Sequence, residues 1–234
     1  MVLTRAQARN FYDRFGKKQD SQAFYEDAAI NDLITRAAFD EAENIFELGC
    51  GTGRFASRLL NKHLSSSASY IGIDLSRTMI DIATQRLLPY RDRAKLIQTD
   101  GPIHFPIPNH SVDRVVSTYV LDLLSELDIR QAISEAHRVL IPSGKLCLVS
   151  LTFGVTLPSR IVCALWSAIF RLRASFIGGC RPILLDSFFE QQSWTVGYRN
   201  VITQYGVPSE VFIASPKIMT NGAFNQNASM GTAS

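Results

Sequence analysis

One segment near the start of the chain constrains the fold more than any other. The apolar residues Ile45, Phe46 and Leu48 lead directly into glycines at positions 49, 51 and 53, and a helical pattern follows over residues 55–61. This order predicts a strand, a loop with exposed backbone and a helix N-terminus. Main-chain N–H groups in such a place can bind a nucleotide-like ligand.

The spacing of the glycines separates two classes of ligand. A dinucleotide loop has the pattern G-x-G-x-x-G, whereas here Arg54 stands where the last glycine belongs and Gly53 comes one residue early. Glu47 lies at the end of the preceding strand, where a carboxylate would repel a pyrophosphate but attract an ammonium or a sulfonium group. The loop therefore predicts a site for S-adenosylmethionine (SAM) rather than for NAD.

Strand-like runs and helical patterns alternate through the middle of the chain. Strands are predicted at 44–48, 69–73, 94–98, 112–118 and 145–151, and helices at 55–61, 78–88 and 129–140. Such alternation predicts an α/β fold with a doubly wound, mostly parallel sheet and helices on both faces. Pro142, Ser143 and Gly144 are expected to end the last of these helices and turn into the next strand.

The two ends of the chain have different patterns. Residues 4–39 are predicted to form one or two helices, with Asp20 or Ser21 as the N-cap ahead of 22–39. A helix is predicted at 183–192, strands at 194–203 and 210–214, and a flexible tail at 216–234. We expect a single domain over 1–215, with an N-terminal helical cap at 4–39 and an amphipathic lid at 157–180.

Composition excludes several classes of function. The net charge of +3 is too small to predict a nucleic-acid groove, and the N-terminus lacks the apolar core of a signal peptide. The four cysteines show no C-x-x-C spacing and the four histidines no ligand spacing, so buried thiols and no metal site are expected. These features together favour a cytoplasmic protein.

Two aspartates follow predicted strands on the same edge of the sheet. Asp74 ends the second strand, roughly 20 residues past the glycine loop, where an acidic side chain can accept hydrogen bonds from ribose hydroxyls. The alternative for Asp74 is the N-cap of the helix that starts near Arg77. Asp100 ends the third strand, where it could bind the exocyclic amine of an adenine or serve only as a turn residue before Gly101.

Together these motifs resemble the cofactor motifs of class I SAM-dependent methyltransferases, in that family's order. The resemblance rests on Glu47-x-Gly49-x-Gly51-x-Gly53, Asp74, Asp100 and the segments 105–116 and 135–145. The opening Phe11-Tyr12-Asp13-Arg14-Phe15 resembles small-molecule and quinone-type C-methyltransferases. The likeness covers residues 11–215 and implies a seven-stranded sheet whose last strand is antiparallel. Ser143 stands where the family usually has a second glycine, a difference that concerns a turn.

The resemblance also implies a role for each matching residue. Glu47 would neighbour the methionine ammonium, and the loop of Gly49, Cys50, Gly51 and Gly53 would let the backbone approach the cofactor. Asp74 would hold the ribose and Leu75 would pack on the adenine, whose ring Asp100 and Gly101 would contact. Thr118 and Tyr119 would lie beneath the sulfonium and face the acceptor. The product would be S-adenosylhomocysteine.

Methyl transfer needs alignment and exclusion of water, and a general base only where the acceptor must lose a proton. Tyr119, Tyr12 and His110 are the candidates for such a base. Tyr119 is better explained as a wall of the pocket than as a base, and His110 lies in a polar turn. The predicted acceptor-binding residues are Tyr12, Tyr119 and Trp166.

The segment 157–180 has a helical apolar pattern, formed by Ile161, Leu165, Ile169, Leu172 and Phe176. Its charges are all positive, and no acidic residue occurs between Leu151 and Leu185. The apolar run at 161–170 is too short to span a bilayer, which needs ~20 residues. One alternative is a helix that covers the pocket against the sheet edge. The other is a lid that binds a hydrophobic acceptor or rests on an anionic membrane surface.

Three hypotheses for function follow. The first is a methyltransferase for a small, apolar or aromatic molecule, and the second is a lipid or quinone methyltransferase at a membrane surface. The third is a SAM-binding scaffold without catalysis. Methylation of nucleic-acid amines is disfavoured because 117–122 lacks the Asn/Asp-Pro-Pro-aromatic loop that grips the amine. Metalloid methylation through Cys163 and Cys180 is a minor alternative.

Overall fold

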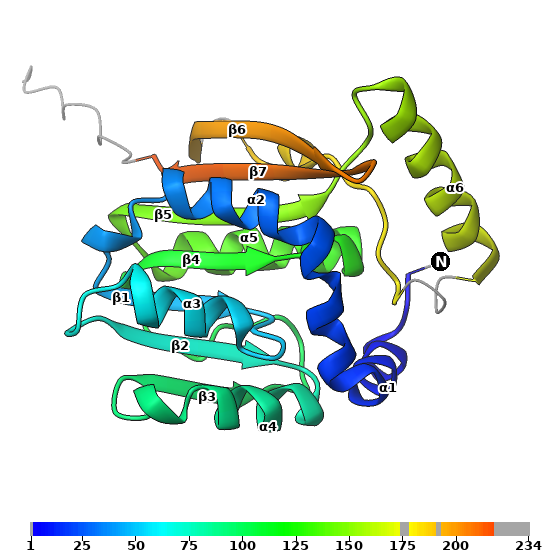
Figure 1. The fold of residues 1–234 in the computed structure, drawn as a ribbon. Coiled ribbons are helices and arrows are strands. Elements are labelled where there is room, and N and C mark those ends of the chain that lie inside the picture. Colours follow the sequence, from blue (N-terminus) through cyan, green and yellow to red (C-terminus); the bar gives the residue numbers. More distant parts are fainter. Residues whose placement is uncertain (1, 174–177, 191–192, 218–234) are drawn as a thin grey trace, which may run out of the picture.

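The computed structural model describes residues 2–173, 178–190 and 193–217. A seven-stranded sheet lies between helices, with strand order β3-β2-β1-β4-β5-β7-β6 (Figure 1). The strands are β1 (Asn44–Leu48), β2 (Ser69–Asp74), β3 (Ala94–Gln98), β4 (Val112–Thr118), β5 (Leu140–Leu151), β6 (Trp194–Gln204) and β7 (Val207–Pro216). β1 to β5 pair in parallel, and β7 is antiparallel to both of its neighbours. The predicted fold class is confirmed, including the antiparallel last strand.

Both faces of the sheet are buried because its strands carry apolar residues at successive positions. On β1, Ile45 belongs to one core and the adjacent Phe46 to the other, and Val115 and Val116 on β4 divide in the same way. The helices α2 (Ala23–Arg36) and α3 (Arg54–Lys62) cover one face, and α5 (Glu126–Val139) covers the opposite face. Burial on both faces explains why these strands read as continuous apolar runs.

Side-chain caps set where several helices begin. Thr4 forms a capping box with Gln7 at the start of α1 (Arg5–Phe15), and Ser76 caps α4 (Arg77–Arg86). Ser125 caps α5, whose first turn also holds acidic residues that favour a helix N-terminus, so this helix starts three residues before the predicted 129. The remaining short elements are 3₁₀ turns: η1 (Gly16–Gln22), η2 (Phe39–Glu41), η3 (Leu88–Tyr90) and η4 (Leu121–Leu123).

Three predictions about element boundaries are wrong. Asp20 and Ser21 lie inside η1 rather than capping α2, which starts at Ala23 without a side-chain cap. The strand β5 begins directly after α5, and residues 141–144 bulge from it, since pairing jumps from Val112↔Leu140 to Arg114↔Lys145. Of the helix predicted at 183–192, only the 3₁₀ turn η6 (Leu185–Phe188) forms among the described residues, and 191–192 lie outside them.

Two helices lie beyond the carboxyl ends of the parallel strands. Figure 1 shows α1 and α6 (Leu157–Arg173) on the side to which β1, β2 and β4 point. No helix in the described ranges is long and apolar enough to cross a membrane. The tail predicted at 216–234 falls mainly outside the described residues, and the division into one domain with a cap and a lid stays a prediction.

Candidate active site

The glycine loop is held against the end of the neighbouring strand β2. The backbone N–H groups of Gly49 and Cys50 both donate to the Ile73 carbonyl, at 2.8 and 3.0 Å. Gly49, Gly51 and Gly53 all have positive φ, at 75°, 53° and 73°. Residues that carry a side chain rarely adopt these backbone angles, so the path of the backbone between β1 and α3 requires glycine at these positions.

Asp74 is bonded directly to this loop. Its Oδ2 accepts from the Gly51 N–H at 2.9 Å, and its Oδ1 accepts from the Ser76 N–H at 2.8 Å. Burial raises the pKa of Asp74, while these backbone donors oppose the change. A carboxylate has about four acceptor positions, so two remain for other donors such as ribose hydroxyls. Ser76, rather than Asp74, caps the next helix.

Glu47 is buried on β1, the strand next to β2, which ends at Asp74. The Tyr70 hydroxyl on β2 donates to its Oε2. Burial raises the pKa of Glu47 to about 8, so the carboxyl group holds a proton at neutral pH unless a cation lies beside it. An ammonium group would favour the ionised form and thereby couple proton release to binding.

The other predicted cofactor residues differ in their surroundings. The Cys50 thiol is buried, and burial raises its pKa. Thr118 is half-buried at the end of β4, and the Leu75 carbonyl accepts from Gln98 Nε2 at 3.5 Å. Asp100 and Gly101 are exposed, and a Cβ on Gly101 would meet no atom within 4 Å. The structure thus brings Gly51 and Asp74 into contact, but leaves Asp100 and Gly101 exposed to solvent.

The N-terminal segment covers the glycine loop. A Cβ on Gly51 would lie 3.0 Å from Oε1 of Gln19 in η1. Gly49 is instead covered by Val120, which follows β4 and whose Cγ2 would lie 2.3 Å from a Cβ on Gly49. Gln19 Oε1 is buried and has no hydrogen-bond partner among the described residues. An unpaired acceptor next to bare backbone suits a ligand that carries N–H or O–H donors, so the residues present fit a nucleoside such as SAM.

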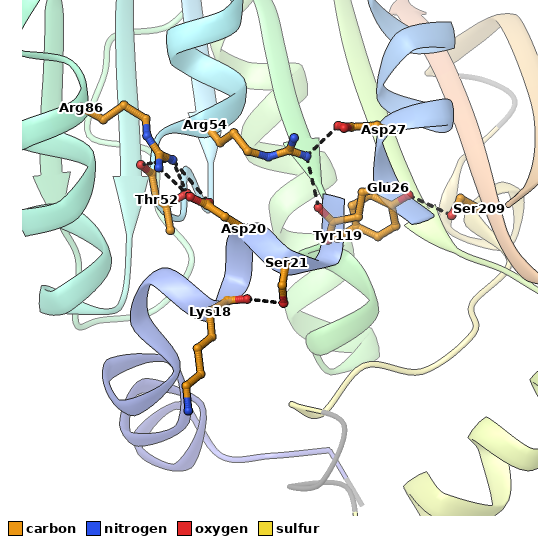
Figure 2. Close-up of polar contacts among 10 residues, drawn as sticks. All are labelled: Lys18, Asp20, Ser21, Glu26, Asp27, Thr52, Arg54, Arg86, Tyr119 and Ser209. Carbon is orange, nitrogen blue, oxygen red and sulfur yellow. Dashed lines mark hydrogen bonds and ion pairs between the residues drawn. The ribbon is translucent and has the colours of Figure 1, made fainter. Parts of the chain in front are cut away.

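Three polar contacts fasten this segment to the loop and to α3 and α4, and a fourth joins the loop to α4 (Figure 2). Asp20 pairs with Arg86 at 2.6 Å and accepts from the Thr52 hydroxyl at 2.6 Å. Arg86 also donates to the Thr52 carbonyl, and Arg54 pairs with Asp27 at 2.7 Å. We call these five residues the polar clasp. Arg54, which breaks the dinucleotide pattern, therefore has a structural partner in α2.

Two of the predicted acceptor residues, Tyr12 and Trp166, lie beside Cys180, and the third, Tyr119, packs on the same cluster. Trp166 Nε1 donates to the Cys180 carbonyl at 3.0 Å. The Tyr12 hydroxyl lies close to Gly178, 3.3 Å from the position that a Cβ there would take. The Tyr119 ring meets Tyr25 edge-on, with ring centroids 5.9 Å apart. We call this group the aromatic cluster: Tyr12, Tyr25, Tyr119, Trp166 and Cys180.

Tyr119 is unusual in its backbone. It has a φ of +56°, a strained angle for a bulky residue, and such strain gathers at functional sites. Its hydroxyl donates to Ser209 Oγ at 2.8 Å, and burial raises its pKa above the ordinary value. Burial has the same effect on Tyr12. Neither phenol can supply a phenolate near neutral pH, and His110 is exposed ahead of β4, at the opposite edge of the sheet.

Sequence reasoning missed Gln19, Tyr25, Arg86 and Asp122. No local pattern identifies them, because each lies in a helical or turn segment and gains its surroundings from distant parts of the chain. Within the described ranges, no three His, Cys, Asp or Glu side chains gather as metal ligands would. Cys163 and Cys180 are buried, and burial raises the pKa of both thiols. This disfavours the thiolate forms through which these cysteines would bind a metalloid.

Comparison with known proteins agrees with this architecture. Residues 45–144, which include the glycine loop and Asp74, match the methyltransferase domain family. This part of the chain is therefore similar to a methyltransferase domain. The chain is 36% identical over 109 residues to a demethylmenaquinone methyltransferase of Chlamydia pneumoniae, covering 47% of this chain and 44% of that protein. The chain spans 44 to 63% of the length of the curated relatives it matches.

Two solved structures share the fold at low sequence identity. The N-methyltransferase NodS of Bradyrhizobium japonicum, in complex with S-adenosylhomocysteine, has a TM-score of 0.58 and 18% identity, covering 82% of this chain and 87% of NodS. The [4+2]-cyclase SpnF has a TM-score of 0.61 and 16% identity, covering 81% of this chain and 80% of SpnF. The second likeness shows that the same fold also occurs in a protein named for another reaction, so the fold alone does not establish methyl transfer.

Proposed function

We propose that the protein transfers a methyl group from SAM to a small, hydrophobic or aromatic acceptor. The observation that carries this proposal is the contact between the glycine loop and Asp74, within a methyltransferase domain. In our proposal the loop 49–53 admits the cofactor to bare backbone, Asp74 holds the ribose, and Glu47 faces the ammonium group. Leu75, Asp100 and Gly101 would surround the adenine, and Thr118 would lie beneath the sulfonium.

When bound, SAM supplies a methyl group on a positively charged sulfur, which is already activated for transfer. The contribution of the protein is then to orient the acceptor and to exclude water, effects worth up to ~7–11 kcal/mol. The segment from α1 to α2 covers the glycine loop, and the aromatic cluster lies beside it at the ends of β4 and β5. We assign acceptor binding to Tyr12, Tyr119 and Trp166, with Tyr119 as a wall of the site rather than a base.

The alternatives are a SAM-binding protein without catalysis and a different reaction on the same fold. Two measurements separate them from the proposal. Calorimetry with SAM and S-adenosylhomocysteine should show binding that Asp74→Ala abolishes and that Asp81→Ala, an exposed control on α4, leaves unchanged. A screen of extracted metabolites with methyl-labelled SAM should then yield a labelled product. Binding without any labelled product would favour the alternatives, and unchanged binding in Asp74→Ala would refute the cofactor site.

We infer a second feature of this function, contact with an anionic membrane surface, from one face of α6. Ile161, Leu165, Ile169 and Leu172 follow one another at helical spacing and are each between 42 and 84% exposed. The opposite face of the helix, with Val162, Cys163 and Trp166, packs on the body of the protein. The helix therefore covers the aromatic cluster with one face and presents an apolar face to solvent, which combines the two alternatives considered for this segment.

Charge and neighbouring residues favour a lipid surface as the partner of this face. Arg160 and Arg171 are exposed beside it, and residues 151–185 contain no acidic side chain. Phe153 and Val155, just before the helix, are exposed as well. An apolar helix face flanked by cations is typical of interfacial binding to anionic lipid. A quinone or lipid acceptor, as the name of the Chlamydia relative suggests, would be reached from such a surface.

Vesicle co-sedimentation tests the membrane contact. We expect the protein to bind vesicles that contain phosphatidylglycerol more tightly than vesicles of phosphatidylcholine alone. Replacing Arg160 and Arg171 by Ala should weaken binding by about 30-fold, because each surface cation contributes about 1 kcal/mol. Arg91→Ala is the matched control, because Arg91 lies in an exposed turn that is distant from α6 in the sequence. Equal binding to both vesicle types, or no binding, would exclude an anionic surface as the partner.

A further inference from the structure

A buried carboxyl group outside the predicted set lies at the acceptor side. Asp122 is in η4, shortly after β4, and is 0% exposed. Neither of its carboxyl oxygens has a hydrogen-bond partner among the described residues, and the same holds for the buried Ser150 hydroxyl on β5. Arg181 donates to the Asp122 main-chain carbonyl, through its backbone N–H at 3.2 Å and through Nη1 at 3.1 Å. Its guanidinium thus donates to the main chain rather than to the carboxyl group.

The surroundings of Asp122 come from four parts of the chain. The titratable and charged groups that interact electrostatically with it belong to α1, to α2, to the end of β4 and to the segment after α6: Tyr12, Tyr25, Glu26, Tyr119, Cys180 and Arg181. Four of these groups belong to the aromatic cluster: Tyr12, Tyr25, Tyr119 and Cys180. That cluster also contains the three predicted acceptor residues. An unpaired buried carboxyl group contributes no stability in such surroundings, because burial without a partner costs free energy. Its placement instead suits a ligand that brings a donor.

Burial also sets the acidity of this group. It raises the pKa of Asp122 to about 7, while the main-chain N–H groups of Asp122 and Leu151, the Arg181 charge and the Ser150 hydroxyl act in the opposite direction. A carboxyl group of that acidity is divided between its two forms near neutral pH, which is the condition in which a proton acceptor works best. The nearby phenols and the Cys180 thiol all have pKa values raised by burial, so none of them offers a comparable base. Burial raises the pKa of Glu26 to about 7 as well, but that carboxylate has a charged partner, Arg54, at 3.8 Å.

We propose that Asp122 is the catalytic residue that accepts a proton from the acceptor, and that the acceptor is therefore a protic molecule of the phenol or enol class. This inference rests on the proposed methyl transfer. In the reaction, the acceptor hydroxyl gives its proton to a carboxylate oxygen of Asp122, and the oxygen keeps the electron pair of the broken O–H bond. That pair forms the new bond to the methyl carbon, while the carbon–sulfur bond breaks and its electron pair stays on sulfur. The products are the methylated acceptor, neutral S-adenosylhomocysteine and a protonated Asp122.

The first test needs no acceptor. Infrared titration of the protein with S-adenosylhomocysteine should reveal a protonated-carboxyl band that is lost with a midpoint near neutral pH. The band should be absent from Asp122→Asn and present in Asp92→Asn, a control at an almost fully exposed position. Thermal unfolding of Asp122→Asn should show an intact fold, because Asn has nearly the same shape. Absence of any neutral-range band that depends on Asp122 would overturn the inference.

The second test compares two phenols as probe acceptors in single-turnover transfer from labelled SAM. Asp122→Asn should slow methylation of 1-naphthol by on the order of 10²–10⁴-fold, and should slow that of 4-nitrophenol, which ionises unaided near neutral pH, far less. Equal losses for both phenols would indicate a merely structural role and overturn the inference. If the unmutated protein binds SAM but methylates neither probe, the infrared titration alone decides for or against Asp122. Failure to bind SAM at all would instead refute the proposed function.

Discussion

The two sides of the carboxyl edge are built in different ways. Around the glycine loop, contacts are polar and short: Asp74 binds the backbone of the loop, and Arg86 binds Thr52 and Asp20. Beneath α6, contacts are aromatic and apolar, and hydroxyls or carboxyl groups there have few partners. The first side can recognise charge and hydrogen-bonding groups, whereas the second side suits a hydrophobic molecule with one proton to lose.

The two sides also differ in how they are assembled from the chain. The glycine loop and Asp74 lie within about one βαβ unit, which is a local arrangement. The aromatic cluster draws Tyr12, Tyr25, Tyr119, Trp166 and Cys180 from five separate segments. In the proposed function, cofactor recognition would therefore depend on one motif, and acceptor recognition would depend on the folded chain.

The largest effect we expect is on the polar side, from Gly51→Val. Gly51 has a φ of +53°, and a Cβ there would lie 3.0 Å from Gln19 Oε1. Valine would distort the loop and remove the approach of the ligand to the backbone, so we expect binding to weaken by about 100-fold, which corresponds to about 3 kcal/mol. Calorimetry with SAM measures the change. Gly197→Ala, whose Cβ would be 3.8 Å from the nearest atom, is the control, and equal affinities in the two variants would contradict the prediction.

A second prediction concerns the polar clasp. Arg86→Ala removes hydrogen bonds to the Thr52 carbonyl, the Thr52 hydroxyl and Asp20, so we expect the free energy of unfolding to fall by about 2 kcal/mol. Urea denaturation measures this quantity. Arg91→Ala removes only an exposed ion pair, with 3.9 Å between Arg91 Nε and Asp92 Oδ1, and should change stability by less than about 0.5 kcal/mol. A similar change in both variants would mean that the clasp does not stabilise the loop.

A third prediction concerns pH, and it follows from buried carboxyl groups on both sides. Burial raises the pKa of Glu26 and Asp122 to about 7 and that of Glu47 to about 8. Between its unfolded and folded pKa values, each group holds a proton only in the native state, so the free energy of unfolding falls as pH rises from about 5 to 8. Arg138 lowers the pKa of Glu135 to about 2, so that contribution is lost as pH falls from about 4.5 to 2.

Urea denaturation across this pH range measures the effect, and Glu47→Gln is the informative variant. The amide cannot ionise, so the fall in stability at high pH should become shallower. The variant also keeps a hydrogen-bond acceptor for the Tyr70 hydroxyl, which limits other disturbances. A pH profile that is identical in the variant would show that Glu47 titrates outside this range.

The smallest effect is expected on the exposed face of α6. Replacing Ile161 and Leu165 by Ser should change the free energy of unfolding by less than about 0.5 kcal/mol, because both side chains are already more than half exposed. Leu148→Ala, at a buried position on β5, should cost about 2–5 kcal/mol by comparison. The serine variant should nevertheless lose vesicle binding. A large loss of stability in it would show that this face packs against protein rather than lipid.

Local patterns predicted much of the sheet. The bounds of β1, β3 and β4 match the predicted 44–48, 94–98 and 112–118, because apolar runs between turn residues carry the signal of buried strands. The bulge at 141–144 and the short turn η6 were not predicted. Both depend on pairing and packing with other elements, which no window of neighbouring residues contains.

The sequence by itself determined the order of strands and helices, the glycine loop and the acidic residue that follows it, because these features arise between residues close along the chain. Only the tertiary structure decided that Gln19 lies against Gly51, that Asp20 joins Arg86, and that the apolar stripe of α6 faces solvent. It also placed Asp122, unpaired, among residues from distant segments. The burial of a side chain and the absence of a hydrogen-bond partner depend on residues from distant parts of the chain, which come together only once the chain has folded.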